Sequence, residues 1–234
     1  DARDAYLAAA RDLSAARQDA ARKLGRLLEQ HLAELAMTGT RCELRLASLA
    51  DAEDQWSETG LDRAELYLSP NPGEELRPLA RIASGGELSR VMLAIRTLAS
   101  PDVPGKTLIF DEVDAGIGGR VADVVGSRLR ALAGKCQVFC ITHLPQVAAY
   151  GQAHFLVAKQ TVKDRTVTQV ELLKNDRRVE EIARMMGGRE ITPGVLAGAE
   201  DMLRTRVNAA ASATSKGPPT TSEAGKAKGE SESG

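Results

Sequence analysis

The chain has 234 residues, 43% of them apolar, which is enough for the core of one large domain with or without appendages. Lysine and arginine (31) nearly balance aspartate and glutamate (32), so a global basic field for nucleic acid is excluded. No apolar stretch approaches the roughly 18 residues of a membrane span, and the N-terminus lacks the layout of a secretory signal. We therefore expect a cytoplasmic protein without a membrane partner. Its three cysteines are expected to be reduced, buried thiols, because the pair in "CQVFC" suits neither a redox pair nor a zinc site.

Residues 1–36 are predicted to form one long helix, because they contain no proline, one glycine and many alanines. Two apolar stripes run along this segment, one repeating every seven residues and one nearer its end: Tyr6, Leu13, Ala20 and Leu27, then Leu24, Leu28, Leu32 and Leu35. The heptad spacing indicates the end of a coiled-coil arm that enters a globular body. An amphipathic helix packed on the domain explains the same pattern, and both interpretations stay open.

The pattern changes to that of an α/β domain from Thr40 onward. "CELRL" and "AELYL" alternate like the strands of a β-rich lobe. Strongly apolar strands then alternate with amphipathic helices, which predicts a parallel sheet covered on both faces. The predicted elements are a helix at 87–99, a strand at 107–110, a helix at 121–133, a strand at 137–142 and a short helix after Pro145.

The C-terminal part is predicted to contain a hairpin, two helices and a tail. The hairpin is formed by "AHFLVAKQ" and "RTVTQVELLK", and the next helix, "VEEIARMMGG", has Gly187 as its stop. Thr192 and Pro193 begin the last helix. After Val207 nothing larger than alanine is apolar, so residues 208–234 are expected to be disordered and residues 37–207 to form the lobe.

Acidic side chains follow the first of the two parallel strands, in "LIFDEVD". The carboxyl ends of parallel strands are where open α/β folds usually bind ligands. Of Asp111 and Glu112, one could hold Mg²⁺ while the other orients or deprotonates water, although acids also occur there simply because loops begin there. His143 follows the next strand and lies at the same edge if the strands are neighbours. It could reach a phosphate oxygen or a metal there, whereas a lone histidine is more often a capping or core residue.

The segment "ASGGELSRVMLAIRTLAS" has the features of a helix N-terminus. Ser84 and Glu87 have the spacing of a capping box. Gly85 and Gly86 in the first turn weaken the helix, and their lack of side chains leaves backbone N–H groups free to donate hydrogen bonds to a phosphate. The expected buried stripe of this helix is Leu88, Val91, Ile95 and Leu98.

Taken together, "SGGEL", "TLIFDEVDAGIGG" and "CITHLPQVAAY" resemble the signature motif, Walker B strand, D-loop and H-loop of ATP-binding-cassette (ABC) ATPases. Together with "VEEIARMMGG", the sequence from about Ile82 to Gly188 closely resembles that of the RecN family of bacterial DNA repair proteins, which are relatives of the SMC proteins. The resemblance implies an α/β fold, the C-terminal lobe of an ABC/SMC-type P-loop NTPase head with a coiled-coil helix at its N-terminus. It also implies ATP-driven head dimerisation and hydrolysis in recombinational repair of DNA double-strand breaks, at the nucleoid.

The resemblance assigns a role to each matched residue. Asp111 would bind Mg²⁺, Glu112 would be the base that activates water, and His143 would contact the γ-phosphate of ATP. Asp114 would be the D-loop acid that meets the second head. The start of the helix would reach the partner's ATP with Ser84, Gly85, Gly86 and Glu87, the last in place of the glutamine of transporters. Sharp turning at this interface would depend on Gly116, Gly118 and Gly119.

One expected element is missing, because "GxxxxGK[ST]" occurs nowhere in the chain. RecN-like chains carry this loop in an N-terminal Walker A lobe, and the chain does not begin with methionine, so we expect a C-terminal fragment that is inactive alone. Its partners would be that lobe, a second copy of the head and, by resemblance only, DNA. Two alternatives stay open: a non-catalytic nucleotide-binding dimerisation module, and a metal-dependent phosphoesterase or nuclease with Asp111, Glu112, Asp114 and His143 as ligands.

Overall fold

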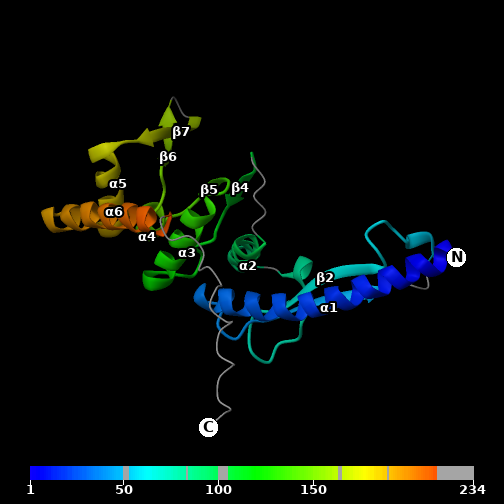
Figure 1. Cartoon of the computed structure of the whole chain (residues 1–234). Coiled ribbons are helices and arrows are strands. Elements are labelled where there is room, and N and C mark those ends of the chain that lie inside the picture. The colour runs from blue at the N-terminus through cyan, green and yellow to red at the C-terminus, as the bar shows by residue number, and fades with distance from the viewer. Residues whose placement is uncertain (50–52, 83, 100–104, 163–164, 189, 215–234) are drawn as a thin grey trace, which may run out of the picture.

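The computed structural model describes residues 1–49, 53–82, 84–99, 105–162, 165–188 and 190–214. It is an α/β structure in which a long N-terminal helix lies beside an antiparallel ribbon, a central α/β part follows, and a helical end carries a projecting hairpin (Figure 1). Within these ranges, no helix is both long and apolar enough to cross a membrane.

The N-terminal helix α1 (Ala2–Glu34) packs one side on the ribbon and leaves part of the heptad stripe exposed. Its buried side includes Leu28 and Leu32. Gly25 is needed there, because a Cβ at this position would lie 2.8 Å from the carbonyl oxygen of Cys42. Ala20 and Leu27 of the heptad stripe are exposed. The helix is therefore packed on the domain, while part of its heptad stripe stays exposed, and the end of a coiled-coil arm remains a prediction.

The ribbon confirms the predicted β-rich lobe. Strand β1 (Arg41–Ser48) pairs antiparallel with β2 (Asp62–Ser69), and β2 pairs with the short β3 (Arg77–Pro78). Short 3-10 helices occur at Glu53–Gln55 and Leu79–Arg81. The carboxylate of Asp62 accepts hydrogen bonds from Ser14 (2.8 Å) and Arg17 (3.0 Å), which fixes α1 to the ribbon.

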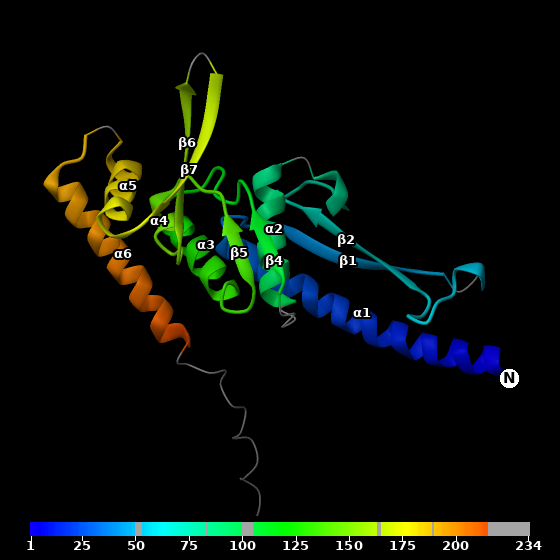
Figure 2. The same ribbon diagram turned by 90° about the horizontal axis from the view of Figure 1, so that it is seen from above.

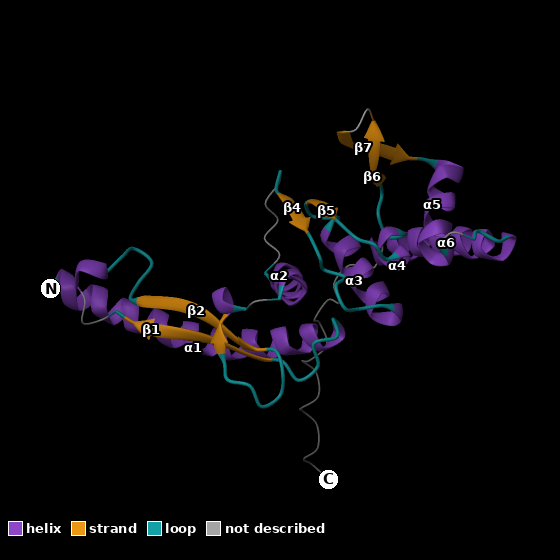
Figure 3. Cartoon of the chain, turned by 180° about the vertical axis from the view of Figure 1, so that it is seen from behind, coloured by secondary structure: helices purple, strands orange, loops and turns teal. Residues whose placement is uncertain are grey.

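The central part contains the two predicted parallel strands, β4 (Thr107–Phe110) and β5 (Gln137–Cys140), in register from Thr107↔Gln137 to Phe110↔Cys140. Helices α2 (Gly85–Leu98), α3 (Gly119–Leu132) and α4 (Pro145–Ala148) lie near them on one side (Figure 3). β4 has its predicted bounds, whereas β5 ends at Cys140, short of the predicted residue 142. The main core joins α1, α2, α3 and these strands through side chains such as Leu32, Val91, Phe110, Val113 and Val125.

The prediction that helices cover both faces of the parallel sheet is wrong for the described residues. Alternate side chains of a strand point to opposite faces. Phe110 is buried against the core, but its neighbour Ile109 is 70% exposed. Phe139 and Ile141 are exposed as well. The helices of this chain therefore cover one face, and an apolar face is left open.

The C-terminal part has the predicted order of elements. Strands β6 (His154–Val162) and β7 (Arg165–Leu173) form the antiparallel hairpin, which projects from the body in Figure 2. Helices α5 (Asn175–Gly187) and α6 (Pro193–Thr214) pack through a small core of Ile182, Ala183 and Ala199.

The ends of these helices refine the prediction. Helix α5 ends at Gly187 as predicted, and the next residue, Gly188, has a φ of 68°, the left-handed region that glycine favours. Thr192 caps α6, since its Oγ1 accepts from the N–H of Val195 at 3.3 Å. Helix α6 continues to Thr214, past residue 207 where the predicted lobe ends, and residues 215–234 of the predicted tail lie outside the described residues.

Two neighbours on β4 test which face of the sheet is buried. Phe110→Ala removes a side chain that is 4% exposed, and the free energy of unfolding should fall by about 3–5 kcal/mol. Ile109→Thr keeps a β-branched residue at an exposed position, and the change should stay within about 0.5 kcal/mol. Urea denaturation followed by circular dichroism measures both. Similar losses in the two variants would mean that the Ile109 face is covered.

Candidate functional site

The carboxyl ends of β4 and β5 lie side by side, which confirms the expected neighbourhood of Asp111 and His143. The N–H of Ile141 donates to the carbonyl oxygen of Phe110 at 2.9 Å, so the pairing continues past the end of β5. Asp111 is exposed, and the His143 side chain is 72% exposed. Both side chains are therefore accessible from one edge of the sheet.

The acidic turn, residues 111–118, connects β4 to α3. It is closed by two backbone hydrogen bonds, from Ala115 N–H to Glu112 O (3.0 Å) and from Ile117 N–H to Asp114 O (3.3 Å). Gly116 has a φ of 73°, a left-handed conformation that glycine adopts without steric cost. Glu112 has a φ of 55°, which costs a residue with a Cβ roughly 1–2 kcal/mol. The turn thus holds the predicted catalytic base in a strained backbone conformation.

The start of α2 is capped as predicted. Ser84 is exposed, and its Oγ accepts from the N–H of Glu87 at 3.3 Å. The predicted buried stripe is wrong at Leu88, which is exposed. The buried side of α2 instead includes Gly86, Arg90 and Val91, because this side packs against the acidic turn as well as the core.

The glycine pair of α2 lies directly against the acidic turn. A Cβ on Gly86 would lie 2.8 Å from the Cβ of Ala115 and 3.1 Å from the carbonyl oxygen of Glu112. A Cβ on Gly85 would meet Oε2 of Glu112, so that carboxylate lies over the first residue of the helix. Gly86 is buried while Gly85 is exposed, and a ligand at this helix start would therefore touch Ser84 and Gly85 first.

Two residues that the sequence analysis missed tie α2 to the acidic turn. Arg90 is buried, and its Nη1 donates to the carbonyl oxygen of Ala115 at 2.8 Å. Burial lowers the pKa of Arg90, and the nearby charge of Glu87 raises it. Ser89 Oγ donates to the carbonyl oxygen of Asp111 at 2.5 Å. The position of Arg90, one helical turn after Gly86 and followed by apolar residues, could have indicated a buried arginine.

Asp114 lies inside the turn, facing the residues that follow β5. Its side chain is buried, and Oδ2 accepts hydrogen bonds from Thr142 Oγ1 (2.5 Å) and the backbone N–H of His143 (3.0 Å). The ring nitrogen Nδ1 of His143 lies 3.1 Å from the same oxygen. In this chain the carboxylate is turned inward to the loop that follows β5, and the contact of Asp114 with a second head stays a prediction.

Cys140 lies beneath this edge as a neutral thiol. Burial raises its pKa to about 12, and the carboxylates of Asp114 and Asp111 add to the rise. The described cysteines are all free, as expected. Because the thiolate is the nucleophilic form, Cys140 is a packing residue in this environment.

The acids fit a single-carboxylate magnesium site better than a dedicated metal cage. Among the residues that the structure describes, no group of three or more His, Cys, Asp or Glu side chains could hold a metal ion. Mg²⁺ commonly takes one or two carboxylates, with phosphate oxygens and waters as its other ligands. Asp111, exposed at the end of β4, fits that requirement. The four-ligand arrangement of the phosphoesterase alternative is not formed, because Asp114 is bound to Thr142 and His143.

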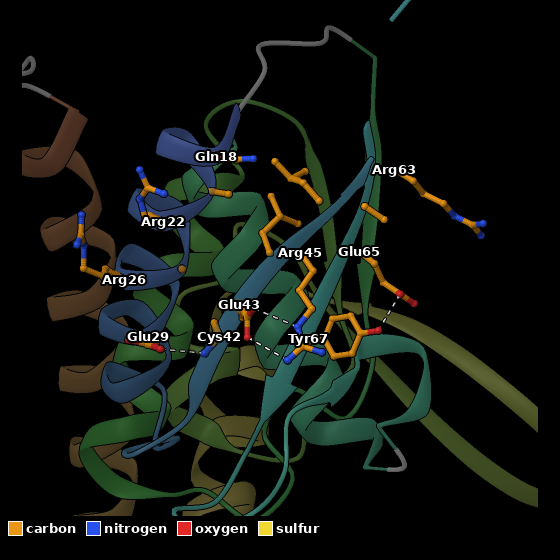
Figure 4. A pocket seen from close by; sticks show the side chains of 15 residues that line it. Gln18, Arg22, Arg26, Glu29, Cys42, Glu43, Arg45, Arg63, Glu65 and Tyr67 are labelled. Carbon is orange, nitrogen blue, oxygen red and sulfur yellow. Dashed lines mark hydrogen bonds and ion pairs between the residues drawn. The ribbon is translucent and has the colours of Figure 1, made fainter. Parts of the chain in front are cut away.

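A groove of about 780 Å³ lies elsewhere, between α1 and the ribbon (Figure 4). Its lining contains none of the predicted site residues. Two of its charged side chains pair with each other: Arg45 contacts Glu43 at 3.1 Å, and it also lies 4.0 Å from the ring centre of Tyr67. Glu29 accepts from the N–H of Cys42 at 2.9 Å. The groove is thus part of the contact between α1 and the ribbon.

Several curated proteins similar to the chain are named DNA repair protein RecN. The DNA repair protein RecN of Haemophilus influenzae is 45% identical over 196 residues, which is 84% of this chain and 35% of that protein. RecN of Deinococcus radiodurans is 48% identical over 176 residues, 75% of this chain and 30% of that protein. This chain is a homologue of the RecN proteins. It spans about a third of the length of the curated relatives that it matches, which agrees with a C-terminal part of such a protein.

Other comparisons add less. No protein family model matches the chain. Among solved structures, the Smc head domain with a coiled coil from Pyrococcus yayanosii is 20% identical, with a TM-score of 0.47 over 70% of this chain and 29% of that one.

The two glycines of α2 are a matched pair for testing the contact with the acidic turn. Gly86→Ala places a methyl group against Ala115 and the Glu112 carbonyl, and the free energy of unfolding should fall by about 1–3 kcal/mol. Gly85→Ala meets only the flexible end of the Glu112 side chain and should change it by about 0.5 kcal/mol or less. Thermal and urea denaturation of both variants measure this difference. Equal stabilities would rule out the close packing at Gly86.

Proposed function

We propose that this chain is the C-terminal half of an SMC-like ABC ATPase head that functions in the repair of DNA double-strand breaks. The observation that carries the proposal is the direct packing of a glycine-started helix on an acidic turn, with Asp111, Glu112 and His143 exposed around it. The homology to RecN proteins supports the role in DNA repair.

An N-terminal Walker A lobe would complete the head. The sequence lacks a phosphate-cradling "GxxxxGK[ST]" loop, and the chain spans only a third of its relatives. Exposed apolar patches commonly mark interaction surfaces. The open face of β4 and β5, with Ile109, Phe139 and Ile141, supports docking of this lobe. The exposed members of the heptad stripe of α1, Leu13, Ala20 and Leu27, support pairing with the other helix of a coiled-coil arm.

The exposed residues at the sheet edge would bind and hydrolyse ATP. Asp111 would hold Mg²⁺ directly or through water, and the ion when bound would neutralise charge that develops on the transferred phosphoryl group. The Glu112 carboxylate would orient the attacking water and accept its proton. His143 would contact the γ-phosphate from the end of the neighbouring strand.

The start of α2 would serve the ATP of a second head. Ser84 and Gly85 are exposed at a helix N-terminus, where free N–H groups and the helix dipole favour an anion. A phosphate there requires the Glu112 carboxylate to leave Gly85, which side-chain rotation permits. Glu87 would act through the cap at Ser84. ATP between two heads would join them, and hydrolysis would release them. DNA as a partner and a cytoplasmic, nucleoid-associated location follow from the names of the relatives alone.

Separate substitutions of the two exposed acids test their roles in the complete protein. Glu112→Gln keeps the shape of the side chain but removes the proton acceptor, so ATP turnover should fall by roughly 10²–10⁴-fold. ATP binding should survive, and a dimer with bound ATP should accumulate. Asp111→Asn should instead weaken Mg²⁺ binding and reduce both pairing and turnover. Phosphate release and light scattering measure the two steps.

Three outcomes would contradict these assignments. Unchanged turnover in Glu112→Gln would remove that residue as the base. ATP-dependent pairing without turnover in the parent protein would favour the non-catalytic dimerisation module. Metal-dependent cleavage of a phosphodiester without ATP would favour the phosphoesterase.

The chain alone should not bind Mg-ATP with micromolar affinity, because the missing loop would supply most phosphate contacts. Isothermal titration calorimetry of the 234-residue chain tests this, and the complete protein is the positive control. Micromolar binding of Mg-ATP by the chain alone would contradict the proposal that the head is divided between two lobes.

A further inference from the structure

A buried carboxylate connects the acidic turn to the loop that follows β5. Asp114 is 3% exposed, and burial of an ionised carboxylate is costly unless hydrogen bonds or charges compensate it. Two consecutive residues contact Oδ2: it accepts hydrogen bonds from Thr142 Oγ1 at 2.5 Å and the His143 N–H at 3.0 Å, and His143 Nδ1 lies 3.1 Å away. Thr142 Oγ1 also accepts from the N–H of Leu144 at 3.0 Å, so the carboxylate and the loop form one network.

This network fixes one side of the His143 ring and leaves the other side available. A carboxylate beside Nδ1 favours a proton on that nitrogen, and such an outer partner commonly sets which ring nitrogen serves the ligand. Because Nδ1 lies 3.1 Å from Asp114 Oδ2, Nε2 is the ring nitrogen on the side away from the carboxylate. Because the His143 side chain is 72% exposed, Nε2 has room to meet a ligand.

We propose that Asp114 is a positioning residue for His143: it holds Nδ1–H and thereby presents Nε2 to the γ-phosphate. The part that concerns phosphate rests on the function proposed above for His143. The contact between Asp114 and the His143 ring lies within this chain and can be tested without ATP or a second head. Asp114 therefore acts within one head, through a neighbouring side chain, instead of across the contact between two heads.

The hold on the ring can be measured without ATP. The chain has three histidines, His31, His143 and His154, so ¹⁵N-histidine labelling gives a simple spectrum, and His143→Gln identifies the signals of His143. Under conditions where the ring is neutral, ring ¹⁵N shifts should show the proton on Nδ1. In Asp114→Asn an uncharged oxygen replaces the carboxylate, and the proton should move to Nε2, as in free histidine in water.

Thr142→Val is the matched control for damage to the loop. It removes the hydroxyl that binds both Asp114 and Leu144, but it leaves the carboxylate beside the ring. Stability should fall while the proton stays on Nδ1. A parent spectrum with the proton on Nε2 would overturn the proposal, and so would the same shift of the proton in Thr142→Val and Asp114→Asn.

The contribution to hydrolysis is measured in the complete protein. Asp114→Asn should lower turnover by about 10–100-fold with little effect on ATP affinity, as for other residues that orient a functional histidine. Adding Asp114→Asn to His143→Ala should cause no further loss, because Asp114 acts through the ring. Fully additive losses would overturn the proposal. A parent protein without ATPase activity would instead contradict the proposed function, and the ring ¹⁵N shifts would still decide the hold on His143.

Discussion

The close approach of helix α2 to the acidic turn is the contact on which the rest of the site depends. Gly86 permits it, because any larger residue would collide with Ala115, and Arg90 secures it through the Ala115 carbonyl. Ser89 adds a hydrogen bond to the backbone of Asp111 at the other end of the turn. Since the same turn leads inward to Asp114 and from there to His143, one packing contact sets the positions of both strand ends.

Sequence was informative where a pattern acts locally. The apolar run of β4, the hairpin of β6 and β7, and the cap of α2 depend on near neighbours, and the structure has them as predicted. The shared edge of Asp111 and His143 followed from the topology of parallel strands. The direction of Asp114 could not be predicted, because its spacing from Asp111 does not specify which way a side chain leaves a turn. Leu88 was wrongly predicted to be buried, because the acidic turn, which is distant in sequence, decides which side of α2 is buried.

The prediction that helices cover both faces of the parallel sheet failed for a different reason. An apolar strand indicates burial on both sides, but the sequence of the strand does not say which chain segment provides the cover. Phe110 finds its cover within this chain and Ile109 does not. The same holds for α1, where Leu28 packs inward and Leu27 faces solvent. The exposed face of the sheet and the exposed side of α1 both agree with a chain that spans about a third of the length of its relatives.

The attachment of α1 has a mechanical consequence. The helix is bound to the ribbon at several levels: Tyr6 donates to the Ser57 carbonyl, Ser14 and Arg17 hold Asp62, and Glu29 holds the backbone of Cys42. Its last turns then enter the core beside α2. A swing of the helix relative to the ribbon would have to break these bonds together. The helix therefore acts as a stiff lever, so that a tilt imposed at its far end reaches α2 instead of being absorbed at a hinge.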